Sequence, residues 1–180
     1  IGLSYSVASF PAMAELALKE DKSLFFEHLL TATRHILFWT MPIAGLFMVL
    51  RAHIVRVILG AGAFAWVDTR LTAASLFLFS FAIVTQSLVT LFVRAYYALG
   101  KVREPIVYNI IASFVTIFIA VFSVWVMREN ESIEIFFGNF LRIGDLRGIQ
   151  FLSLPLAYSI GALVNALTLG VSIFRINGRE

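Results

Sequence analysis

Residues 71–105 read LTAASLFLFSFAIVTQSLVTLFVRAYYALGKVREP, and the first 23 of them, residues 71–93, carry no charge. Arg70 precedes this run and Arg94 follows it. A helix of that length extends about 34 Å, which is more than the roughly 30 Å hydrocarbon core of a bilayer. Its polar side chains are short hydroxyls and the amide of Gln86, so it lacks the polar face that a helix on a soluble protein carries. The run therefore predicts a membrane-spanning helix.

The residues that follow Arg94 have the composition of a segment at the membrane surface. They combine tyrosines, a glycine, basic residues and a proline: Tyr96, Tyr97, Gly100, Lys101, Arg103 and Pro105. Tyrosine rings favour the headgroup region of a bilayer, and proline favours the first turn of a helix. We therefore expect a short basic turn between two spans, with Tyr96, Tyr97 and Tyr108 in an aromatic belt at the interface.

The composition of the whole chain agrees with this interpretation. Hydrophobic residues make up 60% of the 180 residues and charged residues 14%, against about 25% charged in ordinary globular domains. A soluble chain of this length could not bury so much apolar surface in one core. The formal charge is only +3 and the basic residues stand at the ends of apolar runs, which argues against nucleic acid binding. We expect an all-α integral membrane protein, a multi-span helical bundle.

The apolar runs divide the chain into four full spans and one truncated span. The full spans are expected at residues 36–59, 71–99, 105–127 and 151–174, and residues 1–14 are expected to be the end of a further span. Residues 15–34 mix charged and apolar side chains, which predicts a separate amphipathic helix on the membrane surface. Residues 128–150 form the longest polar stretch and predict an extracytoplasmic loop.

Lysine and arginine placement sets the expected orientation. Four crossings put eight basic residues on one side: Lys19, Lys22, Arg34, Arg94, Lys101, Arg103, Arg175 and Arg179. Six fall on the other side: Arg51, Arg56, Arg70, Arg128, Arg142 and Arg147. All three lysines share the first side, which we place in the cytoplasm because cytoplasmic loops are enriched in basic residues. The expected location is the cytoplasmic (inner) membrane, with several crossings.

The sequence contains no catalytic constellation. Its three histidines have no metal-ligand spacing with carboxylates, no cysteine is present, and no glycine-rich phosphate loop follows a strand. We therefore predict no catalytic residue, no metal site, no cofactor and no enzymatic activity.

Polar side chains at membrane depth are the remaining candidates for a substrate site. Gln86 and Asn165 lie near the middle of their spans, and Asn109 lies one turn into its own. An amide in hydrocarbon needs partners, so each should face another helix or a water-filled substrate cavity. Arg94 either meets a lipid phosphate or anchors its helix at the interface. Arg51, which interrupts the last third of the span at 36–59 and is expected to snorkel to the interface, is the fifth candidate.

Four short motifs carry a family resemblance. They are Arg-Ala-x-Tyr-Ala-Leu-Gly-x-x-Arg-x-Pro over Arg94–Pro105, Phe10-Pro11, Gly-x-Gly-x-Phe over Gly60–Phe64 with Asp68-Thr69, and Leu-Val-Asn-Ala-Leu over Leu163–Leu167. Together they resemble the lipid II flippases of the MurJ/MviN type, within the multidrug/oligosaccharidyl-lipid/polysaccharide exporter superfamily. The chain departs from the family pattern at Ala12, Ala61, Ala65, Lys101 and Glu104.

The resemblance implies a two-lobed, all-helical transporter that moves a lipid-linked peptidoglycan precursor, lipid II, across the cytoplasmic membrane for cell wall biogenesis. This chain would be part of its C-terminal lobe, and the remainder of the same chain would supply the N-terminal lobe. The implied partners are the lipid-linked oligosaccharide, membrane lipids and that remainder. The resemblance also implies a cavity whose cationic residues neutralise the pyrophosphate of the substrate.

Two alternatives stay open at this point. Exporters of other lipid-linked oligosaccharides or of drugs belong to the same superfamily, although the Arg94–Pro105 pattern favours the lipid II branch. A non-transporting membrane scaffold or assembly subunit is equally compatible with the composition.

Overall fold

The computed structural model describes residues 2–19, 21–60, 66–129 and 149–177. They form the helices α1 (Gly2–Leu18), α2 (Lys22–Leu59), α3 (Trp66–Ala98), α4 (Arg103–Glu129) and α6 (Ser153–Asn177), with the 3-10 helix η1 (Ile149–Leu152) before α6. These described residues contain no strand, which confirms the expected all-α class. Most of the loop expected at residues 128–150 lies outside the described residues.

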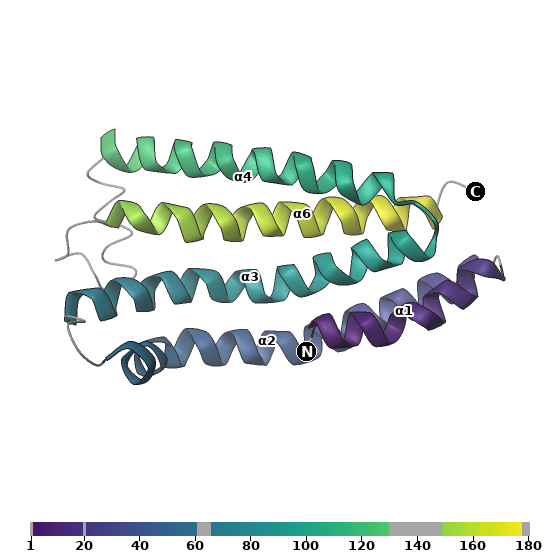
Figure 1. Cartoon of the computed structure of the whole chain (residues 1–180), viewed down its shortest axis with the longest axis horizontal. Coiled ribbons are helices and arrows are strands. Elements are labelled where there is room, and N and C mark those ends of the chain that lie inside the picture. The colour runs from purple at the N-terminus through teal and green to yellow at the C-terminus, as the bar shows by residue number, and fades with distance from the viewer. Residues whose placement is uncertain (1, 20, 61–65, 130–148, 178–180) are drawn as a thin grey trace.

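The long helices lie side by side in the order α4, α6, α3 and α2, and α1 packs beside α2 and α3 (Figure 1). The α1–α2 turn, the α3–α4 turn and the end of α6 share one end of the bundle, which we call the turn end. Four segments are long and apolar enough to cross a membrane: Lys22–Leu59, Trp66–Ala98, Arg103–Glu129 and Gln150–Ile176. The chain is therefore a multi-pass membrane protein, as its charge-free runs predict.

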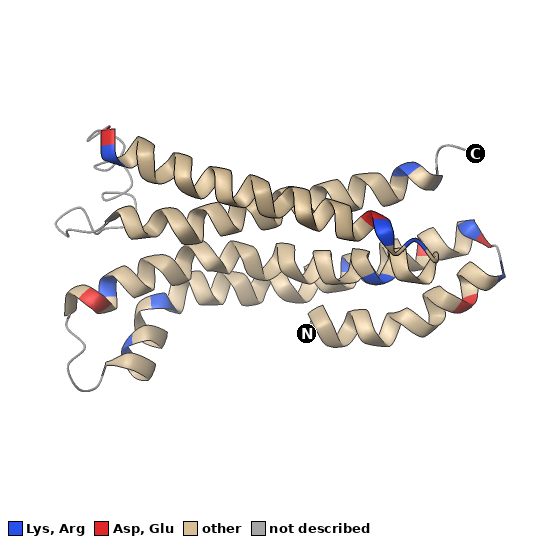
Figure 2. Cartoon of the chain, turned by 45° about the horizontal axis from the view of Figure 1, so that its top comes forward, with Lys and Arg blue, Asp and Glu red and all other residues tan. Residues whose placement is uncertain are grey.

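Helix α2 differs from the prediction of a surface helix at 15–34 and a separate span from residue 36. It runs from Lys22 to Leu59 without a break, because no glycine or proline interrupts the chain near residue 35. Asp21 caps its start by accepting the backbone N–H of Leu24 at 3.1 Å. Its 38 residues measure about 57 Å along the helical path, more than a bilayer core, and its last turns bend away from the rest of the helix (Figures 1 and 2).

The apolar face in the first part of α2 is covered by protein, which corrects the prediction that it lies on the membrane surface. Phe25, Leu29 and Ile36 are at most 1% exposed and pack in one cluster with Met13 of α1 and Leu91 of α3. The sequence pattern could not reveal this, because an amphipathic helix presents the same spacing to a lipid interface and to a neighbouring helix.

A glycine in the left-handed region shapes the α3–α4 turn. Gly100 has a φ of 72°, a backbone conformation that is unfavourable for residues with a Cβ atom. Its N–H donates to the carbonyl of Tyr97 and the N–H of Lys101 donates to the carbonyl of Tyr96, both at 3.0 Å. This pair of bonds is a Schellman cap, which ends α3. Pro105 then lies buried in the first turn of α4, so the glycine and proline of the Arg94–Pro105 motif have structural roles.

The expected aromatic belt is wrong for Tyr96. Tyr96 is 0% exposed, and its ring centroid lies 6.4 Å from that of Tyr108. The hydroxyl of Tyr108 is 2.7 Å from Ser172 Oγ on α6, so these residues join three helices at the turn end. Only Tyr97 of the adjacent pair faces outward, because neighbouring residues on a helix point about 100° apart.

Small residues let α6 pack closely between α3 and α4. A Cβ atom added to Gly161 would collide with the side chain of Thr116 on α4. One added to Gly170 would lie 3.1 Å from Cε2 of Phe92 on α3. Such contacts hold helices together in lipid, where exclusion of water supplies no driving force between them.

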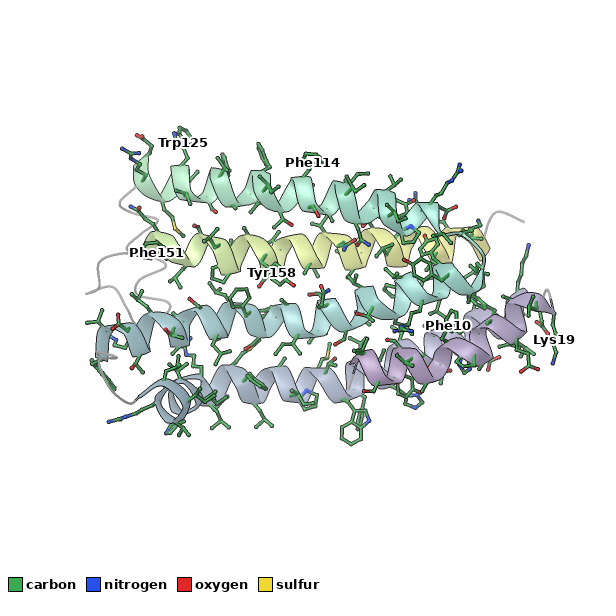
Figure 3. The ribbon with its side chains drawn as sticks, in the orientation of Figure 1. Phe10, Lys19, Phe114, Trp125, Phe151 and Tyr158 are labelled. Atoms are coloured by element: carbon green, nitrogen blue, oxygen red, sulfur yellow. The ribbon has the colours of Figure 1, made fainter. Side chains whose placement is uncertain are left out.

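Charged residues gather toward the two ends of the bundle (Figure 2). Lys19, at the tip beyond α1 (Figure 3), donates to Glu15 at 2.7 Å, and this hydrogen bond together with the lysine charge holds the pKa of Glu15 below its ordinary value. Lys101 and Glu104 lie 3.7 Å apart across the α3–α4 turn. These pairs are solvent-accessible and add little stability, and both lie at the turn end, as suits one polar surface of a bilayer.

We expect Gly161→Val to destabilise the full-length protein in detergent by about 1–3 kcal/mol, because the new side chain would overpack the contact with Thr116. The measurement is the thermal unfolding midpoint. Gly45→Val is the matched control, since a Cβ at this helical glycine of α2 meets no atom within 4 Å. Equal midpoints for the two variants would contradict close packing of α4 on α6.

Candidate functional site

A polar groove of about 260 Å³ lies between α3, α4 and α6. Amides, hydroxyls and small residues line it: Gln86, Asn109, Ala112, Ser113, Thr116, Tyr158, Gly161, Ala162 and Asn165. We call this set the polar groove. It brings together three of the five candidates from the sequence, namely Gln86 of α3, Asn109 of α4 and Asn165 of α6.

The centre of the polar groove is a pair of asparagines. Asn165 Nδ2 donates to Asn109 Oδ1 at 2.7 Å, which links α6 to α4 at membrane depth. The other polar atom of Asn165, Oδ1, is buried and has no hydrogen-bond partner in the part of the chain that the structure describes. An amide oxygen left unpaired away from water costs about 1–3 kcal/mol, so this atom needs a donor from outside these residues.

Hydroxyl groups complete the α4 wall. Ser113 Oγ donates to the carbonyl of Asn109 and Thr116 Oγ1 donates to that of Ala112, each at 2.8 Å. Each hydroxyl has thereby used its one O–H donor, and its oxygen can still accept a hydrogen bond from a group in the groove. Ser113 and Thr116 were not predicted from the sequence, although their spacing from Asn109 (i, i+4, i+7) places all three on one helix face.

Tyr158 is a further lining residue that was not predicted from the sequence. It projects from α6 into the space beside α3, where its ring centroid lies 5.7 Å from that of Phe79 (Figure 3). The sequence offered no signal for it, because a single tyrosine near the start of a span is most simply an interface residue.

Arg94 lies on α3 toward the turn end from the groove. It follows Gln86 by eight residues, which is about 12 Å along the helix and an offset of about 80° around it. Its side chain is half-buried, and no carboxylate among the described residues forms an ion pair with it. A cation is therefore available within two to three turns of the neutral amides.

Arg51 is separate from the polar groove. It belongs to α2, whereas the groove is built from α3, α4 and α6. Its Cζ atom lies 4.8 Å from the ring centroid of Phe77 on α3, and Arg56 makes a similar contact with Trp66 at 5.5 Å. These cation–π contacts join α2 to α3 at the end opposite the turn end. The structure thus gives Arg51 a packing role and does not bring it to the other candidates.

The chemistry that the polar groove offers is neutral hydrogen bonding. Its lining contains no acidic or basic side chain, and the described residues contain no group of three or more side chains suited to hold a metal ion. Carboxamides both donate and accept, so they can bind hydroxyl and amide groups of a polar molecule.

Comparison with known proteins identifies the family. Residues 1–173 match the family model described as Lipid II flippase MurJ. A Thermotoga maritima protein named "Probable lipid II flippase MurJ" is 32% identical over 100 residues, which are 56% of this chain and 21% of that relative. The chain thus spans well under two thirds of the relative's length, and no solved structure matches it. Because the family model covers residues 1–173 of the 180, this chain belongs to the lipid II flippase MurJ family.

Proposed function

We propose that the full-length protein flips lipid II across the cytoplasmic membrane and that this chain forms part of its C-terminal lobe. Membership of the MurJ family supports the activity, and the residues outside this chain would supply the N-terminal lobe. The observation that carries a role for this part of the protein is the asparagine pair, whose Asn165 Oδ1 still needs a donor. Transport of this kind requires no covalent step, so the proposal includes no enzymatic reaction and no cofactor.

In this proposal the polar groove borders the path that the lipid II headgroup takes through the protein. That headgroup is a sugar–peptide unit, rich in hydroxyl and amide donors, joined to its lipid through a pyrophosphate. Gln86, Asn109 and Asn165 would exchange hydrogen bonds with it in place of water. A neutral hydrogen bond contributes only about 0.5–1.5 kcal/mol net, which lets the headgroup be held and then released. Weak, exchangeable contacts suit a transporter better than a tight site does.

Arg94 would meet the phosphate end of the same substrate. Its guanidinium offers a planar fork that matches two phosphate oxygens, and no described carboxylate competes for it. The spacing along α3 places this charge toward the turn end, while the neutral amides lie closer to the middle of the span. The headgroup would thus be met first by Arg94 and then by the groove.

The proposed orientation puts the turn end in the cytoplasm, following the lysines at residues 19, 22 and 101. Single cysteines introduced as Lys101→Cys, in the turn before α4, and Glu129→Cys, at the last residue of α4, test it in the full-length protein. A membrane-impermeant thiol reagent added to intact cells should label only Glu129→Cys. Labelling of Lys101→Cys instead would reverse the topology.

The test of the proposed site compares Arg94→Lys with Arg94→Ala in cells that depend on this flippase. If Arg94 grips phosphate bidentately, lysine should support growth almost as poorly as alanine while the protein level in the membrane stays normal. Arg103→Lys is the matched control, because Arg103 is an exposed arginine in the first turn of α4. Full growth with Arg94→Lys would make Arg94 an interface anchor, because either side chain can snorkel.

A further inference from the structure

The side of the α3–α6 contact that faces away from the polar groove is almost entirely apolar. Two pockets of about 640 and 660 Å³ adjoin there, because both are lined by Thr85 of α3 and Leu163 of α6. The first extends to Gly45 of α2 and Leu156 of α6, and the second extends to Phe174 and Arg175 near the end of α6. We call the two together the apolar groove.

The polar atoms that border the apolar groove are already satisfied. Thr85 Oγ1 donates to the carbonyl of Ala82 at 3.2 Å, within its own helix. Ser159 Oγ donates to the carbonyl of Leu78 at 2.7 Å, which ties α6 to α3. Apart from Arg175 at its end, the apolar groove offers water too few hydrogen-bond partners to occupy it, so hydrocarbon is its natural filling. This contrasts with the polar groove, where Asn165 Oδ1 is unpaired.

The apolar groove has a cation at one end only. Arg175 lines it in the last turn of α6, at the turn end of the bundle, where the headgroup layer of one leaflet would lie. The side chain is exposed, and no carboxylate in the described part of the chain pairs with it. Arginine at headgroup depth attracts lipid phosphate, and its fork fits two phosphate oxygens.

We propose that the apolar groove is a seat for one anionic bilayer phospholipid, with an acyl chain along the α3–α6 contact and its phosphate against Arg175. An apolar trough that ends in a guanidinium at headgroup depth complements an amphiphile of this shape. Another membrane helix would fill the trough but would leave Arg175 unmatched unless it carried an acidic residue at the same depth. The seat lies on the opposite side of α6 from the polar groove and does not depend on flippase activity.

The test uses the full-length protein in detergent, with dioleoyl phosphatidylglycerol added and bound lipid counted by native mass spectrometry. Wild type should retain one lipid that Arg175→Ala binds about fivefold more weakly, the expected loss for one arginine–phosphate attraction. Arg103→Ala, which removes an exposed arginine from the same end of the bundle, should bind as wild type does. Equal affinity for wild type and Arg175→Ala would overturn the phosphate contact.

Filling variants test the acyl seat separately. Val171 lines the groove, so Val171→Trp should displace the lipid. Val121 lies on the outer surface of α4, so Val121→Trp should not displace it. Gly45→Leu provides a second filling variant, because Gly45 lines the groove and a Cβ atom at this position meets nothing within 4 Å. Retained lipid in both Val171→Trp and Gly45→Leu would mean that another helix covers the groove, which would refute the proposal. Phosphatidylglycerol should raise the thermal midpoint of the wild type, and inorganic phosphate alone should not. A rise with inorganic phosphate equal to the rise with phosphatidylglycerol would exclude an acyl seat.

Discussion

The organisation of this protein depends on how closely α6 packs between α3 and α4. Gly161 meets Thr116 without room for a Cβ atom, and Gly170 lies against the ring of Phe92. In a bilayer such close contact, together with a few hydrogen bonds between helices, replaces the hydrophobic drive that assembles soluble bundles. Once α6 is fixed in this position, its two sides become different surfaces. One joins α4 and part of α3 around amides and hydroxyls, and the other joins α3 and α2 around aliphatic side chains. The polar groove and the apolar groove are thus two consequences of one packing arrangement.

This division accounts for how a membrane protein can carry polar groups at depth without exposing them to lipid. The amides of Asn109 and Asn165 satisfy each other in part, and the hydroxyls of α4 bond to their own helix. The hydrogen-bonding capacity that these side chains have left requires that the neighbouring region hold either protein or a hydrated substrate. The outer surface of α4 behaves differently: Phe114 and Trp125 project away from α6 and are 70% and 58% exposed, as suits contact with lipid (Figure 3). In the proposed function, the polar side would face the hydrated headgroup of the substrate and the apolar side would face the bilayer.

Much of the fold could be predicted from the sequence, because charge-free runs of 23 residues have few outcomes other than a span. The helices themselves, the turn at Gly100 and the clustering of charge at the ends follow from that constraint. The continuous helix α2 could not be predicted, since the amphipathic pattern before residue 35 fits protein and membrane surface alike, and its true partners, such as Met13 and Leu91, are set by tertiary packing. The burial of Tyr96 could not be predicted either, because the partners of this side chain are also set by tertiary packing. At the site, an amide at mid-span signalled Gln86 and Asn165 individually, but their meeting with Asn109 depends on which faces of three helices oppose each other. The proposed function rests on motif resemblance and family membership, because neutral amides alone do not specify a substrate.

The most direct measurement of the central claim is photo-cross-linking from the two sides of α6 in the full-length protein. A benzophenone amino acid placed at Ser113 would sit in the polar groove, and one placed at Ile160 would sit in the apolar groove. In membranes supplied with labelled lipid II, we predict that Ser113 captures lipid II and that Ile160 captures bilayer phospholipid. If Ser113 captured only another helix of the protein, the polar groove would be a helix contact and the proposed substrate path along it would be wrong.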